Sequence, residues 1–315
     1  MDEFERIAHL RARFAPRPEL ATSLLIGIGD DAAVLAKPDG NLAVSVDASV
    51  QGVHFRPEFA DWASLGGRAF VAALSDLAAM GAQPKAAVMA LIVTLTLDDA
   101  AFVELIRGFA EAADEYRCPV IGGNLSRGTE LSITTTVMGE LEGSGLTRAG
   151  ARPGHDIYVT GTLGAAALGL VLLEARRPEH GRAFVERWRK PVARIAEGAA
   201  LVPIATAAID VSDGALQDLS HICEASGVGA HLDAVAIPMA PGFADLARGL
   251  GRDPLELALT GGEDYELIYT LPGGSAPGPG TRIGRIMERG HGILVKDAAG
   301  HPLPLQPRGY RHFQG

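Results

Sequence analysis

The sequence predicts an α/β (α+β) protein built from two domains. Apolar, β-rich runs alternate with helical patterns along the whole chain. A stretch rich in glycine, arginine and proline, residues 142–155, interrupts this alternation near the middle. With 315 residues, the chain is long enough for two domains of ordinary size. We therefore expect an N-terminal domain over residues 1–141 and a C-terminal domain over residues 152–315.

The first half is expected to open with a short amphipathic helix, because apolar residues recur there at helical spacing. These residues are Phe4, Ile7, Leu10 and Phe14. The expected strands that follow are 42–47, 86–97 and 131–140, and the expected helices are 63–80 and 99–116. The strand 42–47 should end in an acid, and 86–97 is uncharged enough for a buried strand. Gly81 and Pro84 should stop the first of the two helices.

The second half starts again with a strand, a glycine turn and a helix. The expected strands are 156–160, 206–211 and 264–271, and the expected helices are 164–175 and 214–226. A glycine- and proline-rich loop is expected at 272–280. No pattern repeats with a period of 20–50 residues, which excludes a solenoid.

Composition excludes several classes of function. Hydrophobic residues make up 47% of the chain and charged residues 21%, as in globular proteins. The net charge of −10 argues against nucleic-acid or anionic-membrane partners, because both would be repelled. The longest charge-free stretch, 157–173, is too short and glycine-rich for a membrane span, and the N-terminus lacks a signal-peptide pattern. Cys118 and Cys223 form no metal-binding cluster, and we interpret them as reduced, buried thiols of a cytoplasmic protein.

Several aspartates of the first half lie in unusual surroundings. Asp30 and Asp31 sit among glycines and small residues, and Asp47 ends an expected strand. Turn formation and helix capping are the ordinary explanations for such acids. Asp76 is harder to explain, because its neighbours three and four positions away on the expected helix are alanines and a methionine. A buried carboxylate there needs a cation, a hydrogen-bond donor or a metal. His54 lies between Val53 and Phe55, where a structural role is the ordinary explanation.

The second half repeats this pattern. Asp210, Ser212 and Asp213 lie between an expected strand and an expected helix. Ser212 or Asp213 could cap the helix, and the free N–H groups of a helix N-terminus also attract phosphate. Acids beside a phosphate make sense when a cation bridges the two. Glu263 and Asp264 follow a glycine pair, and such pairs allow a ligand to approach the backbone.

The glycine pair Gly122–Gly123 has the same setting, an apolar strand before it and polar residues after it. Together with Arg148 in the connection, these acids and glycine-lined turns predict a metal–polyphosphate site. Hard oxygen ligands favour Mg²⁺. The chain contains no P-loop, no protein-kinase motif and no GxSxG nucleophile motif. The run GTLGAAALG lacks the spacing of a dinucleotide fingerprint.

At these residues the sequence resembles the thiamine-monophosphate kinase family, which belongs to an ATP-binding superfamily that includes aminoimidazole ribonucleotide synthetase. The matching segments occur in order from residue 26 to residue 313: IGIGDDAAVL, SVDASVQGVHF, ALSDLAAMGA, IGGNLSRG, TRAGARPGHDIYVTGTLG, DVSDGALQDL, LTGGEDYEL and GYRHF. Each segment is modestly specific, and the ordered set is highly specific.

The resemblance implies an N-terminal domain that pairs with its counterpart in a homodimer, and a C-terminal α/β domain packed on it. It also implies that ATP and several Mg²⁺ ions bind between the domains. The implied reaction transfers the γ-phosphoryl group of ATP to thiamine monophosphate, giving thiamine diphosphate and ADP.

The resemblance also implies roles for individual residues. The implied metal ligands are Asp30, Ser45, Asp47, Asp76, Asn124, Asp210 and Asp213, with Asp47 and Asp210 central to catalysis. The implied ATP contacts are Gly122, Gly123, Arg148 and Ser212, and the implied thiamine contacts are His54, Glu263 and Tyr310. Asn124 stands where the family often has aspartate, so this position brings no negative charge to a metal.

We expect direct, in-line transfer without a phosphoenzyme, because the acceptor phosphate is already anionic and needs metals more than a general base. Two alternatives stay open. One is another ATP-using enzyme of the superfamily, similar to aminoimidazole ribonucleotide synthetase. The other is a non-catalytic nucleotide-binding protein, which only Asn124 favours.

Overall fold

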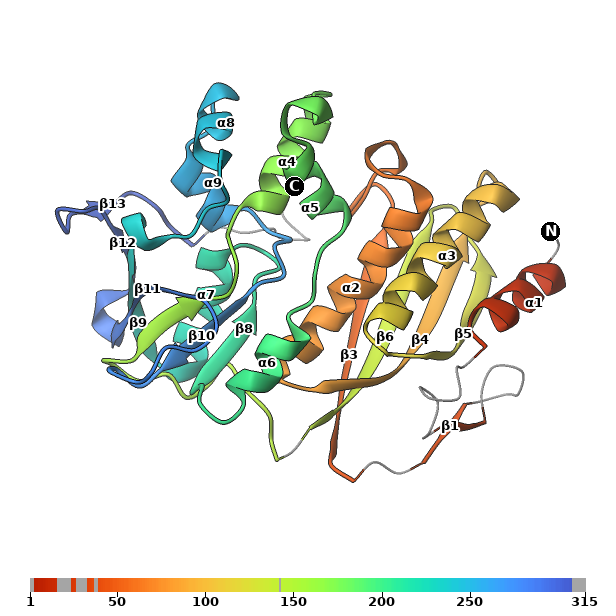
Figure 1. The fold of residues 1–315 in the computed structure, drawn as a ribbon, viewed down its shortest axis with the longest axis horizontal. Helices are drawn as coiled ribbons and strands as arrows, with labels where there is room; N and C mark the ends of the chain where they lie inside the picture. The colour runs from red at the N-terminus through yellow and green to blue at the C-terminus, as the bar shows by residue number, and fades with distance from the viewer. Residues whose placement is uncertain (1–2, 16–23, 27–32, 37–38, 142, 308–315) are drawn as a thin grey trace. The chain divides into compact units, whose positions relative to one another are not determined.

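A computed structural model describes residues 3–15, 24–26, 33–36, 39–141 and 143–307 (Figure 1). The chain splits into two compact units. Unit 1 comprises Met1–Leu77 and Ala82–Ser144, and unit 2 comprises Ala78–Gly81 and Gly145–Gly315. The change of unit after Ser144 falls within the connection at 142–155. Both units combine helices with sheets, which confirms the predicted fold class. Within the described residues, no helix is long and apolar enough to cross a membrane.

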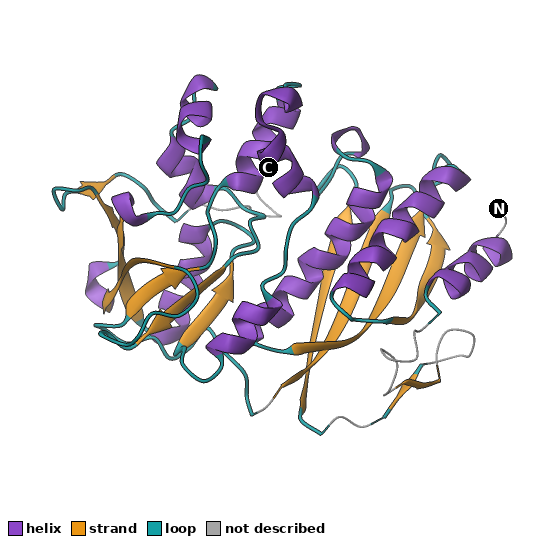
Figure 2. Ribbon diagram, in the orientation of Figure 1, coloured by secondary structure: helices purple, strands orange, loops and turns teal. Residues whose placement is uncertain are grey.

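Unit 1 is built on a mixed sheet with the strand order β3-β6-β4-β5. The strands and helices of this unit are α1 (Glu3–Arg13), β1 (Leu24–Ile26), β2 (Val34–Leu35), β3 (Asn41–Val50), α2 (Trp62–Met80), β4 (Gln83–Val93), α3 (Asp99–Glu115), β5 (Val120–Arg127) and β6 (Ser132–Leu141). Strands β4 and β5 run parallel, because α3 carries the chain back between them, and the other pairs in this sheet are antiparallel. Figure 2 shows α2 and α3 lying across one face of this sheet.

Helices α2 and α3 cross at small residues that allow close contact. A Cβ on Gly66 would lie 2.0 Å from the carbonyl oxygen of Leu105, and a Cβ on Gly108 would lie 1.8 Å from that of Ala63. Around this crossing, Phe70 and Phe109 pack edge to face with ring centroids 5.2 Å apart. The crossing therefore brings the backbones of α2 and α3 together over a core of large apolar side chains.

Unit 2 is built on a second sheet with the strand order β13-β12-β9-β11-β7-β10-β8. The strands are β7 (Asp156–Val159), β8 (Ala207–Asp210), β9 (Val228–Asp233), β10 (Leu267–Leu271), β11 (Thr281–Glu288), β12 (Ile293–Lys296) and β13 (Pro302–Leu303). The helices are α4 (Ala165–Glu174), α5 (Arg182–Arg189), α6 (Ile195–Leu201), α7 (Ala215–Ser226), α8 (Phe243–Gly249) and α9 (Pro254–Thr260). Strands β7, β8 and β10 are buried along their whole length, which explains why their sequences are apolar apart from Asp156, Asp210 and Thr270.

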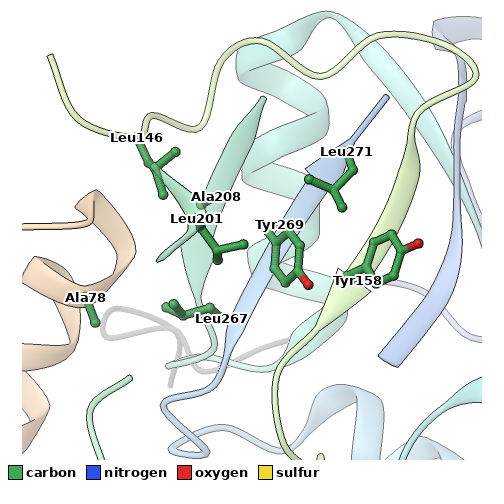
Figure 3. Packing of buried hydrophobic residues seen from close by; sticks show 8 residues of the cluster. All are labelled: Ala78, Leu146, Tyr158, Leu201, Ala208, Leu267, Tyr269 and Leu271. Carbon is green, nitrogen blue, oxygen red and sulfur yellow. The ribbon is translucent and has the colours of Figure 1, made fainter. Parts of the chain in front are cut away.

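A compact apolar cluster fills one part of unit 2. Figure 3 shows its eight buried side chains: Ala78, Leu146, Tyr158, Leu201, Ala208, Leu267, Tyr269 and Leu271. Tyr158 and Tyr269 lie opposite each other on β7 and β10 and stack with ring centroids 5.5 Å apart. The cluster anchors β8 and β10, the two strands that lead into the site described below.

Most predicted elements are confirmed, and three boundaries were wrong. The strand expected to end at Asp47 continues to Val50, and the strand expected over 86–97 spans Gln83–Val93. The strand expected from residue 264 begins only at Leu267, for a reason given below. Cys118 and Cys223 are free and buried, as predicted, and burial raises the pKa of the Cys223 thiol to about 11.

Candidate active site

The predicted site residues of unit 1 begin on the edge strand β3. Ser45 and Asp47 alternate with the exposed residues Val44 and Val46, so their side chains share the face that α2 covers. Asp47 pairs in register with Thr135 of β6, and the Thr135 hydroxyl donates a hydrogen bond to the carbonyl oxygen of Ala69 in α2. One oxygen of Asp47 accepts a 2.8 Å hydrogen bond from the backbone N–H of Ala48.

Asp76 comes from α2 and meets this strand. The Ser45 hydroxyl donates a hydrogen bond to its carboxylate. The prediction that the Asp76 carboxylate, surrounded by small residues on its helix, needs a partner is therefore confirmed. Its partners include the hydroxyl of Ser45 in the sheet. Asp47 lies two residues beyond Ser45, a rise of about 7 Å along the strand. The structure thus brings Ser45, Asp47 and Asp76 into one region of unit 1.

The glycine pair of unit 1 lies in strand β5, so the expected turn at this position was wrong. Gly123 has a packing reason to be glycine, because its Cβ would lie 1.9 Å from the carbonyl oxygen of Met89 in β4. The register Asp47–Thr135–Met89–Gly123 runs straight across the sheet. Gly123 is therefore three strands from Asp47, about 14 Å away.

Asn124 occupies the next row of the sheet, where it pairs with Ala90. Because side chains alternate along a strand, Asn124 belongs to the face opposite Asp47. The structure therefore does not bring Asn124 together with Ser45, Asp47 and Asp76 in one chain.

His54 lies in the turn after β3, where its Nδ1 accepts a 3.1 Å hydrogen bond from the backbone N–H of Val50. This contact leaves the proton of the neutral ring on Nε2, which can then act as a donor.

The predicted residues of unit 2 gather where β8 ends and β10 begins. Asp210 is buried at the end of β8 and pairs in register with Leu267 at the start of β10. The backbone N–H of Glu263 donates to the carbonyl oxygen of Ser212 over 2.8 Å. A Cβ on Gly262 would lie 2.3 Å from that same carbonyl oxygen, so only glycine allows the two loops to approach this closely. The structure therefore brings Asp210, Ser212, Asp213 and Glu263 together.

Asp218 is a member of this group that sequence reasoning missed. Its side chain lies in the first turn of α7 and is 2% exposed. One carboxylate oxygen accepts backbone N–H groups of Ser212, Asp213 and Gly214, each over 3.1 Å. We expected the backbone N–H groups at the start of this helix to be free for phosphate binding. For Ser212, Asp213 and Gly214 that expectation was wrong, because these N–H groups donate to Asp218. Burial, followed by the negative charges of Asp210 and Asp213, raises the pKa of Asp218 to about 8.

The loop 261–266 before β10 has unusual backbone geometry. Glu263 and Tyr265 have φ angles of +69° and +52°, in the left-handed region that non-glycine residues rarely adopt. The fully buried Asp264 between them accepts the backbone N–H groups of Gly164 and Ala166 at the start of α4, over 2.6 and 3.1 Å. This long-range cap explains why β10 begins late. Burial raises the pKa of Asp264 to about 7.

A second residue that sequence reasoning missed contacts the predicted thiamine-binding acid. The indole N–H of Trp188 in α5 donates a 2.8 Å hydrogen bond to the carboxylate of Glu263. The only signal in the sequence is the presence of a tryptophan in the run RAFVERWRK, and it gives no indication of the partner.

Arg148 lies apart from this group within unit 2. Its carbonyl oxygen accepts a hydrogen bond from Ser226 at the end of α7, whereas Asp213 and Ser212 precede the start of that helix. Its side chain is exposed. Asp30, Asp31 and Tyr310 lie outside the described residues. Among the residues that the structure does describe, no three His, Cys, Asp or Glu side chains form a group that could hold a metal ion alone.

Several known proteins resemble this chain in sequence. Residues 29–141 match the family model "AIR synthase related protein, N-terminal domain". The chain is 40% identical over 308 residues to the thiamine-monophosphate kinase of Escherichia coli strain K12, covering 91% of this chain and 92% of that protein. The match therefore spans nearly the full length of both chains.

Solved structures agree with this result. The crystal structure of thiamine-monophosphate kinase from Stenotrophomonas maltophilia K279a is 36% identical, with a TM-score of 0.82, covering 94% of this chain and 96% of that chain. The structure of AaThiL complexed with AMPPCP and TMP is 31% identical, with a TM-score of 0.80, covering 99% and 97% of the two chains.

Proposed function

Because this chain belongs to the thiamine-monophosphate kinase family, we propose that it transfers the γ-phosphoryl group of ATP to thiamine monophosphate, forming thiamine diphosphate and ADP. The chain is an enzyme of the kinase class. The observation that carries the proposal is its near-full-length likeness to relatives with this activity in their names. The structure of a relative that is 31% identical has been solved in complex with AMPPCP and TMP, which supports ATP and thiamine monophosphate as the two substrates.

The acidic groups of both units fit a role in binding Mg²⁺. In unit 2 the negative charges of Asp210 and Asp213 act on Asp218, and a divalent cation would relieve this repulsion. We assign Asp210 and Asp213 as ligands in unit 2 and Ser45, Asp47 and Asp76 in unit 1, with Asp30 as a further ligand. Asn124 lies on the opposite face of the unit 1 sheet from Asp47, so in this proposal it would hold a separate ion. Mg²⁺ keeps water and phosphate oxygens in its coordination shell, so a few carboxylates suffice. When bound, it neutralises phosphate charge and aligns donor and acceptor.

The remaining residues bind and orient the substrates in this proposal. The acceptor oxygen of thiamine monophosphate is anionic near neutral pH, so no side chain needs to remove a proton from it. Gly122, Gly123, Arg148 and Ser212 contact ATP in this assignment, and His54, Glu263 and Tyr310 contact the thiamine. In its neutral form the His54 ring carries its proton on Nε2, since Nδ1 accepts a backbone N–H. Transfer is direct and in line, without a phosphoenzyme.

We also propose a homodimer that forms through the open face of the unit 1 sheet. Leu42, Val44 and Val46 alternate along β3 and are 48%, 60% and 62% exposed, and Ile92 of β4 is 39% exposed. Because the other face of the sheet packs on helices, this row of apolar side chains is suited to a second copy of the same surface. A cytoplasmic location and the absence of nucleic-acid partners stay predictions.

The activity is tested by mixing the purified chain with MgATP and thiamine monophosphate and separating the products by chromatography. Thiamine diphosphate and ADP should appear in equal amounts. Parallel reactions offer other acceptors, including the substrate of aminoimidazole ribonucleotide synthetase. Product from another acceptor alone would assign a different enzyme of the superfamily, and ATP binding without turnover would support the non-catalytic alternative.

A further inference from the structure

The backbone around Glu263 is held in a conformation that the loop would not adopt by itself. Glu263 and Tyr265 both have left-handed φ angles. Such residues persist only where the surrounding structure fixes them, and they concentrate at functional sites. Helix α5, which precedes the loop by more than 70 residues, supplies part of that fixation.

Two arginines hold the end of the loop. Arg187 of α5 donates hydrogen bonds to the carbonyl oxygen of Asp264, over 3.0 Å, and to the carboxylate of Glu266, over 2.8 Å. Arg194 binds the same carboxylate in a bidentate manner, with both bonds at 2.6 Å. The Glu266 side chain is 1% exposed, so these paired charges are shielded from water and fix the position of the chain.

Trp188, the next residue of α5, acts on the side chain of Glu263 itself. Its ring is fully buried, and its indole N–H donates a 2.8 Å hydrogen bond to Glu263 Oε2. An indole N–H is a donor with a fixed direction, because the ring is locked by packing. The hydrogen bond therefore restricts the carboxylate to one orientation before any ligand arrives.

We propose that Trp188 is a positioning residue for substrate binding, which holds the Glu263 carboxylate in the orientation that contacts the cationic thiamine part of the substrate. This inference rests on the proposed function and adds a residue to it. A carboxylate that is already ordered loses less conformational entropy when the ligand binds. Trp188 acts through Glu263 and should leave ATP binding unaffected.

Steady-state kinetics of Trp188→Phe test this role. The phenylalanine keeps an apolar ring and removes the N–H donor. We expect KM for thiamine monophosphate to rise by up to about tenfold, because the released carboxylate must then be ordered when the ligand binds, while KM for ATP stays within about twofold. Trp62→Phe, the same substitution in unit 1, should change neither constant. An unchanged KM for thiamine monophosphate in Trp188→Phe would overturn the proposal.

A double-mutant cycle separates positioning from general structural support. Glu263→Ala should raise the same KM, and adding Trp188→Phe to it should change nothing further, because the acceptor is already gone. Independent, additive effects would contradict the proposal. If Trp188→Phe does not fold, the same question is answered by fluorescence.

Trp62→Phe leaves Trp188 as the only tryptophan, so its emission reports on this site. Adding thiamine monophosphate should change the emission, adding MgADP alone should not, and Glu263→Ala should abolish the response. This readout needs no turnover. Failure to form thiamine diphosphate in the wild-type reaction would therefore count against the proposed function, whereas an unresponsive Trp188 would overturn the present proposal.

Discussion

At the scale of single residues, buried acids set the geometry of the unit 2 site. Asp218 gathers three backbone N–H groups of the loop after β8, and Asp264 caps α4 from the loop before β10. The place of Asp210 between a strand and a helix was predictable from sequence, because both elements have clear patterns close to it. Asp218 and Trp188 were not, because their roles depend on partners that only the folded chain brings to them.

The role of Asp210 is tested by Asp210→Asn. The substitution keeps the size of the side chain and removes its charge, so a bound cation would lose a ligand. We expect kcat to fall by roughly a hundredfold or more, since metal stabilisation of phosphoryl transfer contributes several kcal/mol. Circular dichroism should show an unchanged fold. Asp245→Asn, on the exposed surface of α8, is the matched control, and comparable activity in both variants would contradict the assignment.

Asp264 should make stability depend on pH. Its pKa of about 7 in the folded state is above the ordinary value of 3.8, so the folded chain retains a proton that the unfolded chain releases. This contribution to stability is complete below about pH 4 and is lost as pH rises through 7. The difference in free energy of unfolding between wild type and Asp264→Asn should therefore fall between pH 4 and 8, by at most about 1.4 kcal/mol per pH unit.

Urea unfolding of both proteins at several pH values measures this difference. Other titrating groups are present in both chains and largely cancel in the comparison. A difference that is constant with pH, or that grows as pH rises, would show that Asp264 is not protonated in this way.

At the scale of elements, local pattern predicted the long helices and the short strands β7 and β8 well, and it missed the short helices α5, α6, α8 and α9. The helix expected at 63–80 is observed as Trp62–Met80, because a long apolar pattern followed by a glycine marks both length and end. The expected strand at 264–271 began too early, since its first residues serve a cap on α4, about 100 residues away. Helix α5 has only 8 residues, and its buried Phe184, Val185 and Trp188 cover little more than one turn, which is too short a pattern to identify a helix from sequence.

The close crossing of α2 and α3 makes a prediction for two adjacent glycines. A Cβ on Gly66 would lie 2.0 Å from the carbonyl oxygen of Leu105, so Gly66→Ala should force the helices apart and lower the free energy of unfolding by about 1–3 kcal/mol. In Gly67→Ala the nearest atom is 3.4 Å away, and alanine favours the helix, so stability should hold or rise. Denaturant unfolding compares them, and equal stabilities would contradict the packing account.

At the scale of the whole molecule, the sequence resemblance predicted the family and the fold class, and both are confirmed. Within each unit, several predicted residues converge: Ser45 with Asp76 in unit 1, and Asp210 with Glu263 in unit 2. Gly123 and Asn124 do not join Asp47, because they lie three strands away across the sheet. The order in which the strands pair sets the distance between these residues, and the amino-acid sequence alone does not show that order.

The proposed dimer predicts the effect of a charge on the open face of the unit 1 sheet. Val46→Glu places a carboxylate in the middle of the apolar row on β3, where it would be desolvated and would face its own copy across a twofold axis. Sedimentation should show a dimer for the wild type and a monomer for the variant. Val235→Glu, at a position in unit 2 that is 77% exposed, should leave the dimer intact. A monomeric wild type would contradict the proposal.

In the proposed function, acids of unit 1 and acids of unit 2 bind divalent cations when the substrates are present. Electron paramagnetic resonance of Mn²⁺, a spectroscopic substitute for Mg²⁺, counts bound ions directly in the presence of AMPPCP and thiamine monophosphate. We predict more than one bound Mn²⁺ per wild-type chain, and fewer in both Asp210→Asn and Asp76→Asn. The proposed role of these acids would be contradicted if both variants bound as many Mn²⁺ ions per chain as the wild type. It would also be contradicted if the wild type bound a single ion that the nucleotide alone accounts for.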